Sequence, residues 1–348
     1  MIKTLSVDER FELIKRNTEE VITEEELKKL LKEKKKPVVY LGTAITGKPH
    51  VGYFVWVLKF ADFIKAGFKA KVLLADLHGA LDNTPWIVLE KRYDYYKKVL
   101  PLMFEAVGVD TKNLEFIKGS EFQLKPEYMY DVLQLSTLVS LHDARKSASE
   151  VVKNIQGDSA KLAGFIYPLM QIMDEQYLDV DIQYAGVDQR RIMVLAREIL
   201  PKIGYKPRIE IMTPLIPGLQ GSEGKMSASI EGSKIDLLDD YETIKKKINN
   251  ADCIAGNPDN GIMAFLKYVL MVIKEDKKES FIVERDKKYG GNLSYKSYEE
   301  VEKDFVSKKL HPLDLKNAVA KEISVLLNSI QKKRAVLEKF AKEAYSKE

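Results

Sequence analysis

The sequence has a single cysteine, Cys253, among its 348 residues, and it has neither a charge excess nor a long apolar segment. One thiol cannot form an internal disulfide, and we expect it to be inert in a reducing compartment. The 56 basic and 52 acidic residues leave a net charge of +4, which by itself does not indicate nucleic-acid binding. No apolar run approaches the ~20 residues of a membrane span, and the charged N-terminus lacks the apolar core of a signal peptide. We therefore expect a cytoplasmic protein that does not enter a membrane.

Between Pro37 and about residue 232, short apolar runs alternate with segments of helical periodicity. Runs rich in β-branched residues and leucine predict buried strands at Val38–Leu41, Lys71–Ala75 and Leu114–Ile117. Helices are predicted at Gly52–Ala66, at Pro85–Val107 with a kink or break at Pro101, and at Pro126–Lys146. This alternation predicts an α/β fold with a Rossmann-like, doubly wound parallel sheet. Such sheets bind ligands at the carboxyl ends of their strands, where Gly42 and Asp76 fall.

The segments before and after this region have a different pattern. Residues 1–36 are charged and predict helices at Val7–Arg16 and Glu24–Lys35. After residue 232, helical periodicity predominates at Ser233–Ile248, Gly261–Lys274 and Leu313–Ala344, with one strand signal at Ser280–Val283. We therefore expect a domain of residues 1–232, followed by a mainly α-helical C-terminal domain of residues 233–348.

The most informative segment is Tyr40–Gly52, in which an apolar strand runs into a glycine-rich turn and then a helix. Main-chain N–H groups at such an edge can face a phosphate. Gly42, Gly47 and Gly52 would allow close approach of the backbone. His50 could donate to a phosphate, although a histidine that merely caps the helix is the ordinary alternative.

A second polyphosphate-type loop, Gly221–Ser229, follows about 175 residues downstream and contains Lys225, Met226, Ser227 and Ser229. Attack on the α-phosphate of ATP builds charge on phosphate oxygens, so the site needs a main chain that approaches the phosphate closely and mobile cations. Lys48, His50 and Lys225 could supply the cations. The order and separation of the two loops make the pair far more specific than either loop alone.

Two further segments carry polar residues in functional patterns. Pro168 suits a first helical position, and Tyr167, Gln171 and Asp174 then lie within about 60° of one another on one helix face. A phenol, an amide and a carboxylate on one face can hold a ligand that has both a cation and a hydroxyl, although a solvated polar stripe is the alternative. In Asp181–Arg191, Gly186 precedes Asp188 and Gln189 at a predicted helix start. That carboxylate could hold a ribose or simply cap the helix.

The two loops resemble the HIGH and KMSKS motifs of class I aminoacyl-tRNA synthetases. From about Asn17 to about Leu327, the chain resembles the tyrosyl-tRNA synthetases of archaeal and eukaryotic-cytosolic type. Further matching segments are Leu74–His78, Phe116–Leu124, Tyr167–Glu175, Gly186–Arg190 and His311–Asn317.

The resemblance implies a function for each matching residue. Tyr40 and Asp174 would bind the hydroxyl of tyrosine, and Asp76 and His78 would line the same pocket. The α-ammonium would be held by Tyr167, Gln171 and Gln189, and the ribose by Asp188. ATP would be bound and activated by Gly42, Gly47, His50, Gly52, Lys225, Met226, Ser227 and Ser229.

The resemblance also implies the substrates and partners. L-tyrosine and ATP would form tyrosyl-adenylate, and tRNA(Tyr) would accept the tyrosyl group. Mg²⁺ would be carried by the nucleotide, with no metal site on the protein. A connective insertion at about residues 77–162 would form a homodimer interface, residues 221–231 would form a mobile loop, and the helical domain would bind the anticodon.

The chain departs from the family pattern at two positions. Tyr53 stands where the general class has a second histidine, and Ala228 replaces the second lysine of the downstream motif. Because the Met-Ser-Ala-Ser form also occurs in tryptophanyl-tRNA synthetases, tryptophan is a second candidate substrate. The sequence also leaves open a nucleotidyltransferase that does not act on RNA and a catalytically idle RNA-binding protein built on a synthetase scaffold.

Overall fold

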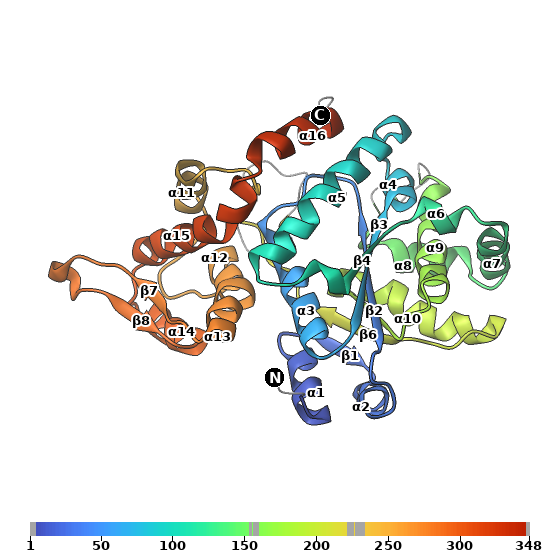
Figure 1. Ribbon diagram of the computed structural model, residues 1–348, viewed down its shortest axis with the longest axis horizontal. Helices are drawn as coiled ribbons and strands as arrows, with labels where there is room; N and C mark the ends of the chain where they lie inside the picture. The colour runs from blue at the N-terminus through green and yellow to red at the C-terminus, as the bar shows by residue number, and fades with distance from the viewer. Residues whose placement is uncertain (1–4, 153–154, 156–159, 221–225, 227–233, 346–348) are drawn as a thin grey trace.

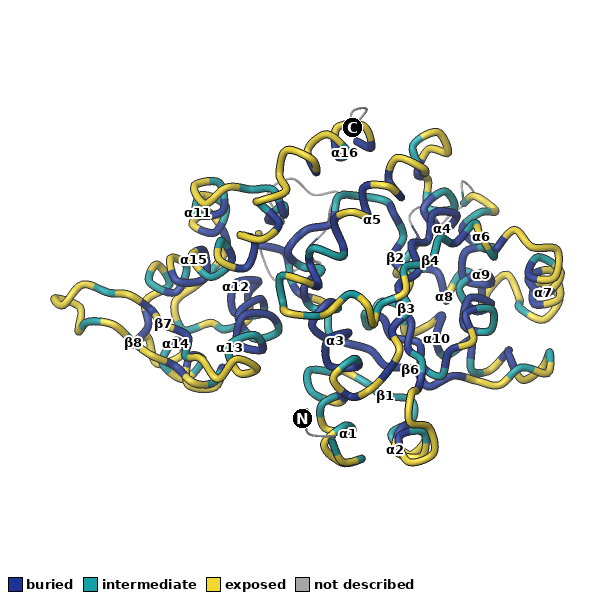
Figure 2. Tube along the Cα trace, in the orientation of Figure 1, coloured by how far each residue is buried: buried dark blue, intermediate teal, exposed yellow. Residues whose placement is uncertain are grey.

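The computed structural model describes residues 5–152, 155, 160–220, 226 and 234–345. An α/β body contains both the N-terminal segment and the sheet, and a mainly helical region lies beside it (Figure 1). The strands and the inner faces of the helices are buried in both parts (Figure 2). Among the described residues, no helix is both long and apolar enough to cross a membrane.

Six strands form the sheet, in the order β1-β6-β5-β2-β3-β4. All neighbouring strands are parallel except β1, which runs antiparallel to β6. The chain winds outward from β2 through β3 to β4, then returns to the other side of β2 with β5. The carboxyl ends of β2 and β5 therefore form a topological switch point, where ligands bind in such sheets. The strands are β1 (Glu20–Ile22), β2 (Val38–Ala44), β3 (Lys69–Ala75), β4 (Leu114–Lys118), β5 (Ile182–Gly186) and β6 (Ile209–Thr213).

Both faces of the sheet are covered, as the near-continuous apolar strands require. Val39 and Leu41 of β2 pack into the core on one face, and the buried Tyr40 belongs to a separate cluster on the other. Figure 1 shows α3 (Phe54–Lys65) and α5 (Leu89–Ala106) on the first side, and α8 (Leu141–Ala148), α9 (Ala163–Tyr177) and α10 (Arg190–Ile199) on the second. The predicted doubly wound sheet is confirmed.

The N-terminal segment contains a strand that the sequence did not reveal. Helix α1 (Val7–Lys15) begins with a capping box of Ser6 and Glu9, and α2 (Glu24–Glu33) begins after Thr23. Between them, β1 adds an antiparallel edge to the sheet. Three residues are too few to show an alternating pattern, so their pairing with β6 decides the structure.

The connective segment is mostly helical, and one helix prediction was wrong in detail. The predicted helix 126–146 is two helices, α7 (Pro126–Ser136) and α8, because the side chain of Ser140 caps a new start by accepting from the Asp143 N–H. Helix α5 runs through Pro101 without a break. The shorter helices α4 (Asp76–Leu81) and α6 (Ser120–Gln123) directly follow the carboxyl ends of β3 and β4.

The C-terminal region is helical, as predicted, apart from a small hairpin. Strand β7 is joined by an unpredicted partner, β8. The predicted helix 233–248 begins only at Tyr241, where Asp240 caps it, because residue 236 instead bridges to His50. The predicted helix 313–344 is two helices, and the second packs against α5 (Figure 1). The elements are α11 (Tyr241–Asn249), α12 (Gly261–Phe265), a π-helical segment η6 (Leu266–Met271), α13 (Val272–Lys277), β7 (Phe281–Val283), β8 (Leu293–Tyr295), α14 (Tyr298–Val306), α15 (Pro312–Gln331) and α16 (Arg334–Tyr345).

The lone thiol lies in this helical region. Cys253 is half-buried, and burial raises its pKa to about 11, so the group is protonated at neutral pH. This agrees with the expected inert thiol.

Candidate active site

A cavity of about 960 Å³ lies at the switch point, between the carboxyl ends of β2 and β5. Twelve of the sequence-predicted site residues line it, and they come from segments spread over most of the α/β body. Asp76 does not line the cavity, and Lys225, Ser227 and Ser229 lie outside the described residues. The twelve are Tyr40, Gly42, Gly47, His50, Gly52, His78, Tyr167, Gln171, Asp174, Asp188, Gln189 and Met226.

Asp174 of α9 forms the buried end of the cavity, with 1% of its surface exposed. Its Oδ1 accepts hydrogen bonds from Gln123 Nε2 at 2.7 Å and from the Tyr128 hydroxyl at 2.9 Å. Burial raises the pKa of the carboxyl to about 8, and the two hydrogen bonds act in the opposite direction because they favour the ionised form. A buried acceptor of this kind is available to a ligand that brings its own hydrogen-bond donor.

His78 lies beside this carboxylate. Its Nε2 is 3.8 Å from Asp174 Oδ2 and is buried without a hydrogen-bond partner, and its Nδ1 lies 3.4 Å from Gln123 Nε2. Burial lowers the pKa of His78 to about 4, so the ring is neutral at pH 7. The ring edge packs on Tyr167, with the two centroids 4.6 Å apart. Asp174 therefore has a neutral neighbour here and not a fixed counter-charge.

Tyr40 places its hydroxyl near the same end of the cavity. The hydroxyl donates to the main-chain oxygen of Gln171 at 3.4 Å, a long bond that a better acceptor could replace. Burial, followed by the nearby Asp174 carboxylate, raises the pKa of Tyr40, so the phenol remains a donor. Gln183 of β5 is in register with Tyr40 and also lines the cavity.

The predicted polar face of α9 exists, although its start was placed wrongly. The helix begins at Ala163, so Pro168 lies inside it and not at its first position. The relative spacing of Tyr167, Gln171 and Asp174 does not depend on the start, and all three line the cavity. Gln171 Nε2 donates to Gln189 Oε1 at 3.2 Å, which joins α9 to the segment after β5.

Asp76 lies just outside the cavity lining, at the carboxyl end of β3. Its Oδ1 accepts the Ser120 N–H at 2.9 Å. A Cβ on Gly119 would lie 2.8 Å from that oxygen, so glycine is required for this approach. The observed contact of Asp76 is thus with the chain that leads into α6, the helix that carries Gln123.

The glycine-rich turn, which also lines the cavity, holds His50 as a helix cap. Its Nδ1 accepts the Gly52 N–H at 3.2 Å, and burial lowers its pKa to about 3. His50 is therefore neutral, contrary to the expectation that it could supply a cation, and it can act only as a neutral donor through Nε2. A Cβ on Gly52 would lie 2.9 Å from the His50 ring and 3.2 Å from Met226 Sδ, which explains the glycine.

Helix α5 supports this turn through residues that the sequence did not single out. Tyr96 donates to the Gly47 oxygen at 2.5 Å, and the buried Arg92 donates to the Thr46 oxygen. Arg92 also lines the cavity, whereas the Lys48 ammonium lies 5.7 Å from the Tyr345 ring of α16. Lys48, the other possible cation, is thus not among the cavity-lining residues.

The ribose candidate and the downstream motif both reach the cavity. Asp188 follows Gly186, where a Cβ would lie 2.7 Å from Asp188 Oδ1, so the glycine makes room for the carboxylate. Of the second motif, Met226 is described: its N–H bonds the Ile216 oxygen at 2.9 Å, and its buried side chain lines the cavity beside Gly52.

Gln123, Tyr128, Gln183 and Arg92 are the site residues that sequence reasoning missed. The bonds to Asp174 span 51 and 46 residues, so no local spacing could reveal them. The available signal was weak: Gln183 is a polar residue in a buried strand, and Gln123 lies within a segment that resembles the family.

Comparison with known proteins assigns the chain to a family. A model for class I tRNA synthetases (W and Y) matches residues 32–328. The cytoplasmic tyrosine–tRNA ligase of Danio rerio is 48% identical over 99% of this chain and 64% of its own length. The tyrosine–tRNA ligase of Haloarcula marismortui is 43% identical over 97% of both chains. The present chain thus spans slightly less than two thirds of the vertebrate relatives and nearly all of the archaeal one.

Solved structures agree with this assignment. Tyrosyl-tRNA synthetase from Archaeoglobus fulgidus, crystallised with L-tyrosine, is 40% identical and superposes with a TM-score of 0.86 over 94% of this chain and 100% of its own. A tryptophanyl-tRNA synthetase from Aeropyrum pernix K1, at 19% identity and a TM-score of 0.68 over 93% of this chain and 84% of its own, shares the fold. The chain belongs to the class I tRNA synthetases and, within them, to the tyrosyl-tRNA synthetases of archaeal and eukaryotic-cytosolic type.

Proposed function

We propose that the protein is a tyrosine–tRNA ligase, which activates L-tyrosine with ATP and transfers the tyrosyl group to the 3′ end of tRNA(Tyr). The observation that carries the proposal is the buried Asp174 carboxyl group near the Tyr40 phenol, in a cavity that also contains the glycine-rich turn. A phenolic hydroxyl can donate to Asp174 and accept from Tyr40, and an amino acid that is apolar at this position can do neither.

The remaining roles are those that the family resemblance implies, and they are supported by the presence of the described residues in one cavity. Tyr167, Gln171 and Gln189 would hold the α-ammonium, and Asp188 would hold the ribose. His50 and the main chain of Gly42–Gly52 would bind the ATP phosphates, together with Lys225, Ser227 and Ser229 of the downstream motif. Asp76 would support the pocket through the segment that carries Gln123.

The reaction needs positioning and charge stabilisation and no covalent nucleophile on the protein. The tyrosine carboxylate attacks the α-phosphate, pyrophosphate leaves, and the donors around the turn stabilise the charge that develops on the phosphate oxygens. Mg²⁺ would arrive with ATP. Among the described residues, no group of three or more His, Cys, Asp or Glu side chains could hold a metal.

The helical region from residue 233 is proposed to bind the anticodon of tRNA, in a cytoplasmic enzyme. The exposed Lys246, Lys332 and Lys333 provide positive charge there. Gln331 donates to the Leu237 and Asp239 main-chain oxygens at 2.9 Å, which fixes the end of α15 near the start of α11.

A homodimer is proposed through the connective segment at about residues 77–162. Large apolar side chains that normally lie in a core are exposed on and around α7, as expected of an interface with a second copy. Sedimentation should give a dimer, and Leu133→Asp should give monomers while Val325→Asp, an equally exposed position on α15, should not. A wild-type monomer would contradict this part. The exposed residues are Leu124, Tyr130, Leu133, Leu138 and Leu141, at 63%, 69%, 63%, 42% and 62%.

Amino-acid-dependent exchange of labelled pyrophosphate into ATP tests the central proposal. Tyrosine should support exchange, and tryptophan and phenylalanine should support far less. Exchange with tryptophan alone would favour a tryptophanyl enzyme. A folded protein that exchanges with none of the three would be a catalytically idle, synthetase-like protein.

A further inference from the structure

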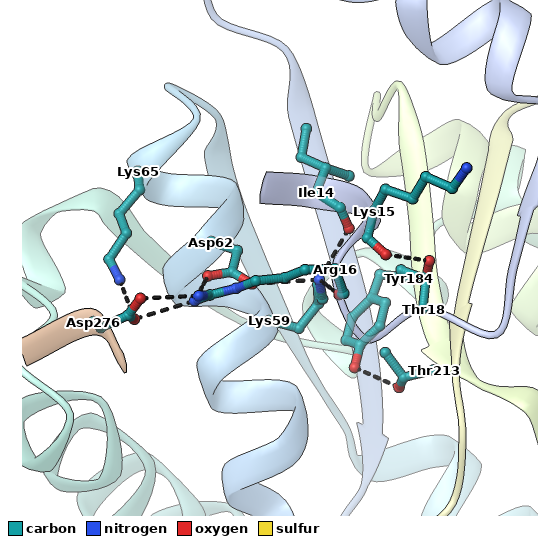
Figure 3. Close-up of polar contacts among 10 residues, drawn as sticks. All are labelled: Ile14, Lys15, Arg16, Thr18, Lys59, Asp62, Lys65, Tyr184, Thr213 and Asp276. Atoms are coloured by element: carbon teal, nitrogen blue, oxygen red, sulfur yellow. Dashed lines mark hydrogen bonds and ion pairs between the residues drawn. The ribbon is translucent and has the colours of Figure 1, made fainter. Parts of the chain in front are cut away.

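A polar joint connects three parts of the molecule that are distant in sequence (Figure 3). Arg16, the residue after α1, donates through Nε to Asp62 Oδ2 of α3 at 2.9 Å, and its Nη2 contacts Asp62 Oδ1. The same guanidinium donates to both Asp276 oxygens of α13, at 2.9 and 3.1 Å. One planar group thus bridges the α/β body and the helical region in fixed geometry.

Two lysines complete the joint. Lys65 Nζ of α3 lies 2.5 Å from Asp276 Oδ2, so α3 reaches α13 directly as well as through Arg16. Lys59 is 3% exposed and lies 3.3 Å from Asp62, and its ammonium donates to the Ile14 oxygen at 2.9 Å and to the Arg16 oxygen. The buried lysine therefore fixes the main chain from which Arg16 projects. We call these five side chains, Arg16, Lys59, Asp62, Lys65 and Asp276, the interdomain clamp.

The clamp lies one side-chain layer from the cavity. Helix α3 follows directly after the turn that holds His50 and Gly52. Val55 and Thr213 line the main cavity and also a gap of about 10 Å³ that is bordered by Lys59 and Asp62. Thr213 in turn bonds the Tyr184 hydroxyl at 2.8 Å (Figure 3).

A second, largely apolar joint lies elsewhere on the same boundary. Helix α16 packs against α5 through buried residues that include Leu337 and Ala341, at a distance from the α3–α13 contact (Figure 1). Apolar packing alone is not directional and permits small rotations, whereas two bidentate carboxylate contacts to one guanidinium define an angle.

We propose that Arg16 and Asp276 are positioning residues for tRNA charging. They set the angle between the helical region and the α/β body, and so the position from which a tRNA held by the helical region presents its 3′ end for charging. This inference rests on the proposed ligase function. It predicts that breaking the clamp impairs tyrosyl transfer but not adenylate formation, because the cavity itself keeps all of its lining residues.

The test compares Asp276→Asn with a matched control, Glu284→Gln. Both remove one carboxylate of the helical region, but Glu284 pairs with Lys321 at 2.7 Å within that region and does not reach the α/β body. For Asp276→Asn we expect pyrophosphate exchange within about twofold of the control, and a KM for a tRNA(Tyr) transcript raised by about fivefold or more. Arg16→Gln should have a smaller effect in the same direction, because Lys65 still pairs with Asp276, and the double variant should be no worse than Asp276→Asn alone.

Two results would overturn the proposal. One is charging by Asp276→Asn that equals charging by Glu284→Gln. The other is an equal loss of exchange and charging, which would mean general damage to α3. If Asp276→Asn melts well below the control, Lys65→Met provides the same comparison, because it removes only the ion pair between Lys65 and Asp276. Failure of the ligase assignment is distinguishable, because the wild-type protein would then show no tyrosine-dependent exchange at all.

Discussion

The two ends of the cavity recognise their ligands by different means. At the closed end, buried side chains from α6, α7 and α9 converge on Asp174. At the other end, glycines expose the main chain, and His50 is a neutral cap and not a charge. Selection between similar amino acids needs a buried hydrogen-bond acceptor close to the group that differs. Binding the phosphates of ATP needs only main-chain N–H groups that approach them closely, together with cations. Changes at the two ends should therefore affect different steps.

Lys225→Ala should have the largest effect. Removing a cation that acts on the developing phosphate charge should slow adenylate formation by about 10²–10³-fold. Tyrosine affinity should remain nearly unchanged, because Lys225 is proposed to act on the ATP phosphates and not on tyrosine. Single-turnover adenylate formation and equilibrium tyrosine binding separate the two quantities, and a large loss of tyrosine affinity would contradict a role in the transition state.

Asp174→Ala should affect tyrosine binding and leave the use of ATP nearly unchanged. The tyrosine hydroxyl would lose its acceptor in a buried site, which should weaken tyrosine binding by about 100-fold. The KM for ATP should change by less than about threefold, since Asp174 contacts Gln123, Tyr128 and His78 and not the glycine-rich turn. Equal losses for both substrates would show that the phenol end has been misplaced.

Tyr128→Phe tests the support that the sequence did not reveal. The variant keeps the ring but removes the hydrogen bond to Asp174, so it should weaken tyrosine binding about tenfold at pH 7. It should also raise the pKa of Asp174, because that bond favours the carboxylate. Tyr205→Phe is a control of equal size, since Tyr205 bonds Asp131 at 2.6 Å and does not line the cavity. Identical tyrosine affinities in the two variants would contradict a role of Tyr128 in tyrosine binding.

The smallest effect concerns the stability of the protein without ligand. The folded-state pKa of Asp174, about 8, lies above the ordinary value of 3.8, so the folded state binds the proton more tightly. This contribution is fully present below about pH 4 and is lost as pH rises through 8. Relative to Asp174→Asn, the wild-type Tm should fall by about a few degrees between pH 5 and 8. Burial also raises the pKa values of Glu175 and Glu210 in both proteins. The part of the Glu175 shift that comes from the Asp174 charge is lost in Asp174→Asn, so it is included in the measured difference. A difference that is constant with pH would mean that Asp174 is ionised throughout.

Most of the fold could be predicted from the sequence. In the site, the glycine-rich turn could be predicted better than the surroundings of Asp174. The glycine turn and the Asp188 segment are local strand–turn–helix patterns, and the polar face of α9 depends only on relative spacing, so it survived the misplaced helix start. The partners of Asp174 could not be predicted, because Gln123 and Tyr128 reach it only through tertiary packing. The same holds for β1 and for the cap at Ser140, where pairing and local hydrogen bonds override a helical pattern. His50 could be predicted either as a cation or as a helix cap, because its burial is invisible in the sequence.

The most direct test of the central claim is calorimetric titration of the wild-type protein with L-tyrosine and with L-phenylalanine under identical conditions. The two ligands differ only in the hydroxyl that Asp174 and Tyr40 are proposed to bind. The account predicts that phenylalanine binds at least about 100-fold more weakly, because it leaves a buried acceptor without a partner. Affinities that agree within about threefold would contradict it.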